Sequence, residues 1–231
     1  MVHPVATAVG RALRVVFAGL LVLRHPKPIH ARGAVFEGTV TWRWKARSGI
    51  RWIDEPPTGP LPVVARASRS VGLPAPLPDV DGLAIRFEDE LGAPCDIELA
   101  STGLGMPSRY MLWPHRSPSR ANLHTLLPYD SPLGSVQLCA RTLSPSDLPS
   151  DYDELGRRLE TEPWRLRLYW ARPRGKWHPF AELELRRRPG PLDRNLRFDA
   201  VRHPIPGAGT HAWVAAVRQP TYHLTQGDDA G

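Results

Sequence analysis

His30 is the first residue of this sequence whose type and position suggest chemistry. It stands shortly before Gly33, where a strand-like stretch begins, so its ring could face a cavity inside a sheet. An imidazole titrates near neutral pH and can accept and return a proton. The alternative is a histidine that hydrogen-bonds to backbone at the rim of a barrel. The residue types around His30 leave both interpretations open.

Other catalytic motifs are missing. The sequence has no G-x-S-x-G, no phosphate-binding P-loop and no G-x-G-x-x-G. The pairs His25 with His30 and His203 with His211 lack the i, i+4 spacing and the adjacent acid of a helical zinc site. Three aspartates that stand near one another have no matching histidine: Asp79, Asp81 and Asp96.

Composition indicates one globular domain built from short strands. The chain has 231 residues, of which 42% are hydrophobic, enough for a sizeable core. Its 26 prolines and 19 glycines argue against a helix bundle and for many turns. Eight tryptophans indicate large buried surfaces or a lined cavity.

The positive charge of the chain is dispersed. The net charge is +7, but the only arginine run is 186–188, which we interpret as a solvated loop. We therefore expect no nucleic-acid partner. Cys95 and Cys139 lie far apart, so they predict neither a disulfide framework nor a zinc site, and a reducing cytoplasm is expected.

The N-terminal stretch predicts a helix. The apolar run 15–23 is far below the roughly 20 residues of a membrane span, and no small-residue cleavage site follows it. We expect an amphipathic helix over 5–23 that docks on the barrel and ends at Pro26. The predicted organisation is a helical arm at 1–25, a barrel domain at 26–222 and a disordered tail at 223–231.

Alternation of apolar and polar residues predicts antiparallel strands. It is clearest at 164–171, where Trp or Leu alternates with Arg or Tyr. A polar helix is expected at 152–160, and 50–54 is interpreted as a short partner or edge segment. The strands together indicate a closed barrel. They are predicted at 34–44, 61–70, 82–87, 95–101, 136–141, 164–171 and 177–186.

Four stretches resemble the barrel of haem-dependent catalases, in the same order and with similar gaps. They are His-Ala-Arg-Gly at 30–33, Pro-Val-Val-Ala-Arg-Ala-Ser at 62–68, Asp-Gly-Leu-Ala-Ile-Arg-Phe at 81–87, and Cys-Asp-Ile with Ala-Ser-Thr within 95–102. The resemblance covers 26–116 and 196–222. It implies a mainly β (α+β) protein with a catalase-like antiparallel β-barrel, an N-terminal helix and few short helices.

The resemblance also implies roles for single residues. His30 corresponds to the distal base that moves a proton between the oxygens of a bound peroxide. Ser68 falls on a serine near that base, and Arg66 on an arginine that pairs with a haem propionate. The family's distal asparagine falls on Ser101. A propionate-binding arginine falls on Asp81, whose carboxylate would repel a propionate.

The proximal haem ligand has two alignments. Arg218 and Tyr222 fit the Arg-x-x-x-Tyr of the iron-binding tyrosine. They also fit, together with Phe198 and Pro204, a segment that the family places just after the barrel. Order and spacing favour this second alignment, in which 211–219 forms a short helix or turn and the chain ends before the haem-ligating helix.

Two functions stay open. The first is a haem-dependent oxidoreductase acting on a peroxide, with His30 as distal acid/base. The second is a non-haem descendant that binds or transforms a small, partly apolar molecule in the barrel cavity, with a homo-oligomer left open. In either case His30, Ser68 and Ser101 should converge on one pocket with Arg66 at its mouth. Its lining is predicted to include Val64, Val71 and Leu99; the alternative is a barrel filled with side chains.

Overall fold

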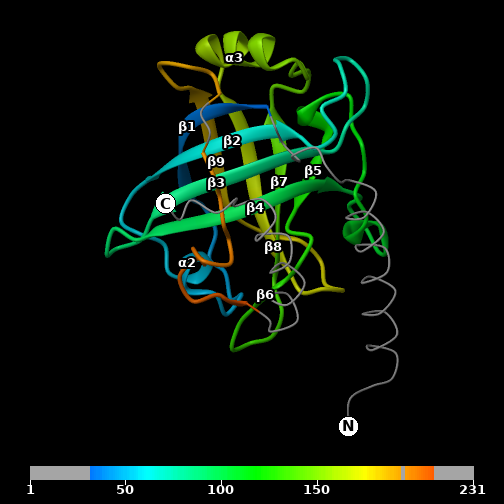
Figure 1. Ribbon diagram of the computed structural model, residues 1–231. Helices are drawn as coiled ribbons and strands as arrows, with labels where there is room; N and C mark the ends of the chain where they lie inside the picture. Colours follow the sequence, from blue (N-terminus) through cyan, green and yellow to red (C-terminus); the bar gives the residue numbers. More distant parts are fainter. Residues whose placement is uncertain (1–31, 194–195, 211–231) are drawn as a thin grey trace, which may run out of the picture.

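The computed structural model describes residues 32–193 and 196–210 (Figure 1). The predicted helix over 5–23, His30, the segment 211–219 and Tyr222 lie outside these residues. The described strands are β1 (Gly33–Trp42), β2 (Leu61–Arg69), β3 (Asp81–Glu88), β4 (Pro94–Thr102), β5 (Asn122–His124), β6 (Tyr129–Asp130), β7 (Gln137–Ser144), β8 (Trp164–Ala171), β9 (His178–Arg187) and β10 (Gly209–Thr210). The α-helices are α2 (Arg51–Asp54) and α3 (Tyr152–Thr161), and two 3-10 helices lie at Ser108–Tyr110 and Pro118–Arg120.

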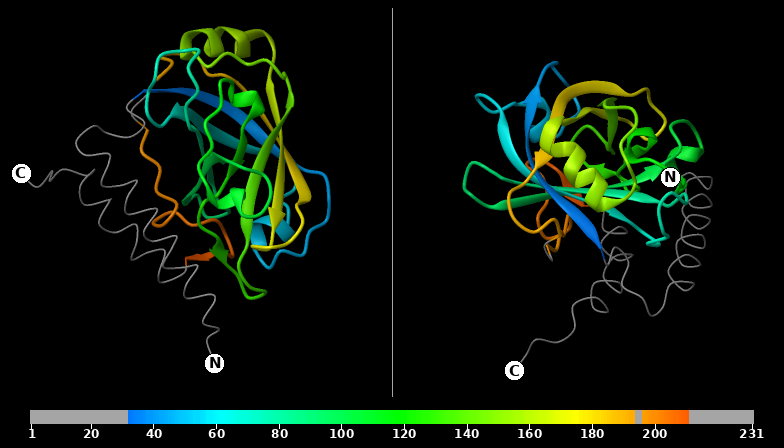
Figure 2. Two further views of the ribbon diagram at one scale, coloured as in Figure 1. Left: turned by 90° about the vertical axis from the view of Figure 1, so that its right-hand side faces the viewer. Right: turned by 90° about the horizontal axis from the view of Figure 1, so that it is seen from above.

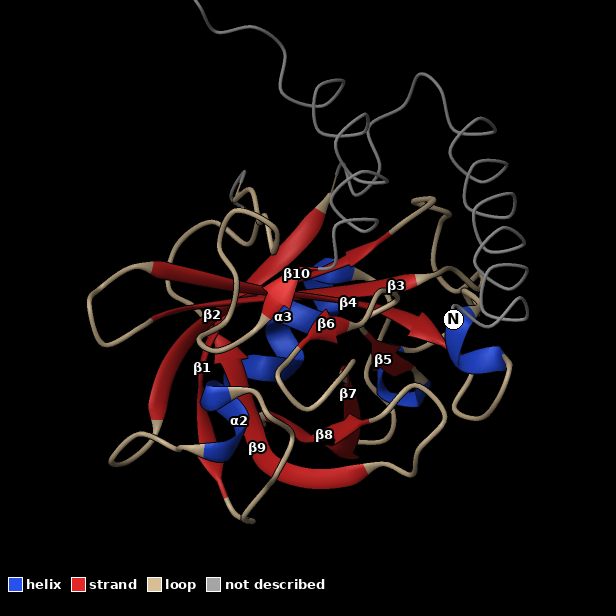
Figure 3. Cartoon of the chain, turned by 90° about the horizontal axis from the view of Figure 1, so that it is seen from below, coloured by secondary structure: helices blue, strands red, loops and turns tan. Residues whose placement is uncertain are grey.

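Eight of the described strands form a closed antiparallel barrel in the order β1-β2-β3-β4-β5-β7-β8-β9. The barrel closes through β1, which pairs with β2 on one edge and with β9 on the other. The remaining two strands, β6 and β10, form a small separate sheet. Viewed from below, the strands surround a common centre (Figure 3). The predicted mainly β, closed-barrel fold is confirmed.

The strands predicted from the sequence agree with the long strands of the structure. All seven predicted strands are present, with ends that differ by a few residues at most. The short strands β5, β6 and β10 were not predicted, because two or three residues are too few to show alternation. The segment 50–54 contains one helical turn, α2, instead of an edge strand. Its consecutive residues Trp52 and Ile53 are both buried, which a strand with one solvent-facing side would not allow.

Helix α3 lies at one end of the barrel, and α2 lies at the other (Figures 1 and 2). The polar helix predicted at 152–160 is confirmed, because α3 spans Tyr152–Thr161. Asp151 caps its N-terminus by accepting hydrogen bonds from the N–H groups of Asp153 and Glu154. Leu155 and Leu159 are buried on the side that faces the barrel. The helix therefore covers the end of the core that lies beneath it.

The interior of the barrel is filled with side chains. Inward-facing positions of the strands are apolar and almost fully buried, and they include Phe36, Ala65, Ile85, Ile97 and Leu183. Their alternation with outward-facing residues follows the two-residue period of a strand. The alternative of a filled barrel therefore matches the described residues.

Gly38 allows β1 and β9 to approach closely enough to close the barrel. A Cβ atom at this position would lie 2.0 Å from the carbonyl oxygen of Glu184 and 2.9 Å from the Leu185 side chain. A backbone atom in a paired strand cannot move aside at little cost. Glycine is therefore required here by the space between the strands.

We predict that Gly38→Ala lowers the free energy of unfolding by about 2–3 kcal/mol, because the added methyl group overpacks the seam between β1 and β9. Gly105→Ala is the control, since nothing lies within 4 Å of its added Cβ. That control should change stability by less than about 1 kcal/mol. Urea unfolding of both variants is the measurement. Equal stabilities would contradict this account of the seam.

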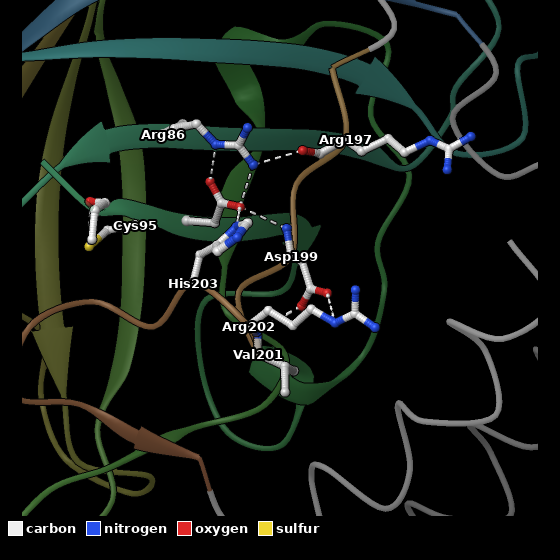
Figure 4. A network of polar contacts seen from close by, with 9 residues as sticks. Arg86, Cys95, Arg197, Asp199, Val201, Arg202 and His203 are labelled. Atoms are coloured by element: carbon white, nitrogen blue, oxygen red, sulfur yellow. Dashed lines mark hydrogen bonds and ion pairs between the residues drawn. The ribbon is translucent and has the colours of Figure 1, made fainter. Parts of the chain in front are cut away.

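After β9 the chain runs along the outside of β1, β3 and β4, to which it is joined by hydrogen bonds. We call this part of the chain, described at 188–193 and 196–208, the crossing segment. Figure 4 shows Arg86 of β3 donating to the Arg197 carbonyl of this segment, and the Asp199 N–H and the His203 ring directed at the carboxylate that Arg86 binds. The group that holds them together is the buried carboxylate of Asp96 on β4. It accepts two hydrogen bonds of 2.7 Å from Arg86, one from the Asp199 N–H at 2.8 Å, and contacts His203 Nδ1 at 2.9 Å.

Asp96 remains ionised although it is fully buried. Burial alone would raise its pKa, but the hydrogen bonds from Arg86, the Asp199 N–H and His203 outweigh burial and hold the pKa below its ordinary value. This stabilisation is therefore complete above the unfolded-state pKa, near 4, and is lost as the pH falls below it. The carboxylate thus fastens the crossing segment to the barrel at neutral pH.

We predict that Asp96→Asn lowers the free energy of unfolding by about 3 kcal/mol or more, because it leaves the Arg86 guanidinium without its anion. Asp147→Asn is the matched control. Asp147 also pairs with an arginine, Arg158, but the two side chains are 75% and 41% exposed. Its loss should change stability by less than about 1 kcal/mol. Similar effects of the two substitutions in chemical denaturation would refute the role of Asp96.

Candidate functional site

Four small residues form a row across the outer face of β1–β4, called the outer row below. They pair successively across the strands: Gly33, Ser68, Gly82 and Ala100. Each has a chain neighbour in the core: Ala34, Ala67, Leu83 and Leu99. Because neighbouring side chains of a strand point to opposite faces, the outer row faces away from the core. A strip of small residues thus lies on the outer side of the sheet, where Gly33 and Ser68 are buried and Gly82 and Ala100 are partly exposed.

Ser101 belongs to the other face. It follows Ala100 of the outer row, and it is fully buried on the side of the core residue Leu123. Its hydroxyl accepts a hydrogen bond from the Asp81 N–H at 3.0 Å and donates one to the Trp113 carbonyl at 2.7 Å. The structure therefore does not bring Ser68 and Ser101 together, and it engages the Ser101 hydroxyl in holding backbone.

Arg66 lies beside the outer row and holds a carboxylate. Its Nε donates to Oδ1 of Asp193 at 3.2 Å, and its Nη2 donates to Oδ2 at 3.4 Å. The N–H of Gly33 donates to the same Oδ2 at 2.9 Å. The Arg66 side chain is 12% exposed and that of Asp193 is 38% exposed. A guanidinium fork and a backbone N–H therefore form a carboxylate-binding site, which the crossing segment occupies.

Gly33 leaves the space in which this arginine lies. A Cβ at residue 33 would be 2.7 Å from Arg66 Cζ and 2.7 Å from the Ala67 carbonyl oxygen. Next to it, Val35 is fully buried, and its N–H donates to the Leu192 carbonyl of the crossing segment at 2.7 Å. The outer face near Arg66 thus carries the apolar Val35 and Ala84, together with the polar Ser68 and with Glu98, which pairs with Ala84.

Asp81 lies at the end of the barrel beneath α3. It is opposite Arg69 in the pairing of β2 with β3, and Asp79 is nearby, 3.9 Å from Arg69 Nε. Burial raises the pKa of Asp81 to about 7; Arg69 opposes this shift and the charge of Asp79 adds to it. Asp81 directly precedes Gly82 of the outer row on β3, and neighbouring residues of a strand point to opposite faces. The Asp81 carboxylate is therefore directed to the inner face and does not repel an anion near Arg66.

The cavity at this end is too small for an organic ligand. It is bounded by strand residues such as Asp81 and by Tyr152 of α3, and its volume is about 10 Å³. A single water molecule needs roughly 10–15 Å³. Of the residues expected at the pocket, Ser68 lines this cavity, whereas Val64, Val71 and Leu99 do not. Leu99 is in the core. Val64 stands between the core residues Val63 and Ala65 and therefore points to the outer face, and Val71 is 57% exposed in a loop.

Two polar residues of the outer face, Asp193 and His124, could not be recognised from any pattern in the sequence. Asp193 stands alone in a Pro- and Gly-containing loop, and only the course of the crossing segment brings it to Arg66. His124 continues the outer row from Ala100 onto β5, and its Nδ1 lies 2.8 Å from Thr102 Oγ1. Burial lowers the pKa of His124 to about 4, so the ring is neutral at physiological pH.

No family model and no curated protein sequence matches the chain. Comparison with solved structures supports the fold. Among solved structures, a fungal catalase superposes with a TM-score of 0.63 at 13% identity, over 93% of this chain and 62% of that one. A bacterial catalase superposes with a TM-score of 0.59 at 13% identity, over 97% and 60%. The chain therefore has a catalase-like fold and spans about 60% of the length of these two catalases.

The described residues do not fit the haem-binding set that the resemblance implies. Arg66, which would hold a propionate, lies on the outer face of the barrel, and Ser101 lies on the inner face, so the two do not line one pocket. Asp81 replaces the second arginine, and Ser101 faces away from the outer row. His30 and Tyr222, the residues assigned to peroxide and iron, lie outside the described part of the chain. We therefore derive no chemical step through haem.

The raised pKa of Asp81 predicts an unusual dependence of stability on pH. The folded protein retains a proton that the unfolded chain releases near pH 4, so this group lowers stability as the pH rises from about 4 to about 7. The full effect is on the order of a few kcal/mol. Asp81→Asn should remove this component and flatten the decline of the melting temperature between pH 5 and pH 8. An unchanged slope would disprove the assignment.

Proposed function

We propose that this chain is a catalase-fold protein that binds a small, partly apolar carboxylate on the outer face of β1–β4, without haem. Arg66 and the Gly33 N–H hold the carboxylate. The apolar part of the ligand lies along the outer row and the neighbouring Val64 and Ala84. Binding requires the Asp193 carboxylate to leave these donors, so Asp193 acts as an internal competitor.

One observation carries the proposal: the donors at Arg66 already hold a carboxylate. A guanidinium fork with parallel N–H donors matches the two oxygens of a carboxylate, and such charge-assisted bonds are about twice as strong as neutral ones. Asp193 is 38% exposed, so its own pair with Arg66 is only partly shielded from water. A ligand that adds apolar contact to the same ionic contact gains free energy that Asp193 does not supply.

The small size of the outer row supports an apolar contact at this place. Gly82 and Ala100 have no side chain that would hold a ligand away from the sheet, and Ala84 adds a methyl group one pair further along β3, where Glu98 of β4 borders the surface. The filled interior supports the same location, since the cavity beneath α3 holds no more than one water molecule. The proton-transfer role of His30 stays a prediction.

We predict that Asp193→Asn raises the affinity for octanoate about tenfold, or 1.4 kcal/mol, because the substitution removes the competing charge and keeps the side-chain shape. Isothermal titration of the full chain measures this affinity. In the double variant Asp193→Asn/Arg66→Gln the gain should disappear. Melting curves of all variants confirm that they are folded.

Two results would overturn the proposal. One is an octanoate affinity of Asp193→Asn equal to that of the unsubstituted chain. The other is a Soret absorption band in protein produced with haem supplied, lost again in Arg66→Gln. That second result would replace the carboxylate ligand by haem and restore the peroxide-dependent interpretation.

A further inference from the structure

The opposite side of the barrel carries a second, separate feature. The outer faces of β1, β9, β8 and β7 bear arginine and glutamate side chains in register, called the charged face below. Thr41, Glu182, Arg167 and Arg141 pair in one row, and Thr39, Glu184 and Arg165 pair in the next. Arg43 and the pair of Glu37 with Arg186 lie at its ends. Over these described residues five arginines face three glutamates, an excess of two positive charges.

Two of the three glutamates of the charged face, Glu182 and Glu184, each contact two arginines. Glu182 contacts Arg43 at 3.4 Å and Arg167 at 3.2 Å. Glu184 contacts Arg165 at 3.0 Å and Arg186 at 3.1 Å. Burial would raise the pKa of Glu184, but the hydrogen bonds from its two arginines outweigh it and keep the pKa below the ordinary value. Each of these two carboxylates is thus shared by two guanidinium groups.

The arginines, in contrast, keep donors to spare. Arg43 and Arg165 each contact their glutamate through Nε, and their side chains are 56% and 55% exposed. A guanidinium has five N–H donors, so the terminal Nη groups remain available within the described surface. Arg167 is held in addition by its stacking on Trp44, with Cζ 4.9 Å from the ring centre. The charged face therefore offers oriented donors and few free acceptors.

A groove of about 350 Å³ lies between these side chains. Its walls include Arg43, Arg165 and the hydroxyl-bearing Thr39 and Thr41, and Leu143, which is 44% exposed, provides an apolar edge. This volume is within the range of sites for small organic molecules, roughly 300–1,000 Å³. Glu182 and Glu184 also line the groove, so it combines arginine donors, the carboxylates that hold them and one apolar contact.

We infer that this groove binds a small organic phosphate. The charged face as a whole, which surrounds the groove, has an excess of two positive charges, and this suits a phosphate monoester with about −1.5 to −2 charges at pH 7 and three acceptor oxygens. Arg43 and Arg165 donate to the phosphate from opposite walls, and Leu143 contacts the organic group. Glu182 and Glu184 are positioning residues, because they fix the guanidinium groups at Nε and leave the Nη atoms directed to the ligand.

The test is the binding of phenyl phosphate to the full chain by isothermal titration at low ionic strength, with phenol and inorganic phosphate as reference compounds. Arg165→Gln and Arg43→Gln should each weaken binding about tenfold, the effect of one lost charge-assisted contact. Arg116→Gln is the matched control, because Arg116 is exposed in a loop away from the groove. It removes the same charge and should change affinity less than about twofold.

Glu182→Gln separates a built site from a merely positive surface. It increases the net charge, so a non-specific charge effect would tighten binding. The inferred site requires the opposite result, since Arg43 and Arg167 lose the anion that orients them. Tighter binding in Glu182→Gln, or an equal loss in Arg116→Gln, would overturn the inference. So would displacement of phenyl phosphate by a short oligonucleotide at far lower concentration, which would indicate a nucleic-acid surface.

Discussion

Closure of the barrel through β1 is the constraint on which the rest of the structure depends. Because β1 pairs with both β2 and β9, the sheet has one enclosed face and one outward face, and each residue of a strand is committed to one of them. Eight strands enclose just enough space for side chains. The interior is therefore used for stability, and both candidate binding surfaces lie outside.

The two buried aspartates show what this division means for electrostatics. Asp81 is on the inner side, where partial neutralisation by Arg69 does not compensate burial, so its pKa is raised to about 7. Asp96 is on the outer side, where Arg86 and the crossing segment supply enough donors to lower its pKa. The same residue type thus destabilises the fold at neutral pH in one place and fastens the chain in the other. The number of hydrogen-bond donors that reach the buried carboxylate thus decides whether its pKa is raised or lowered.

The candidate site was only partly predictable. Arg66 and Ser68 could be placed on one strand face from alternation, and the structure puts both outside. Ser101 was assigned to the same site, but a shift by one residue along a strand changes the face, and the outer position belongs to Ala100. Asp193 follows Arg66 by more than a hundred residues, and no pattern in the sequence relates them. Similarity to catalases at 13% identity shows the fold but does not identify these side-chain contacts.

The sequence by itself determined the long strands, helix α3 and the catalase-like order of the barrel, because alternation, capping residues and turns act over a few neighbouring residues. Only the tertiary structure decided which carboxylate reaches Arg66, whether Asp81 keeps its proton, and how arginines and glutamates of β1, β8 and β9 line up into one charged face. These properties depend on register and on burial. Both are set by the closure of the whole sheet, in which residues far apart in the chain become neighbours.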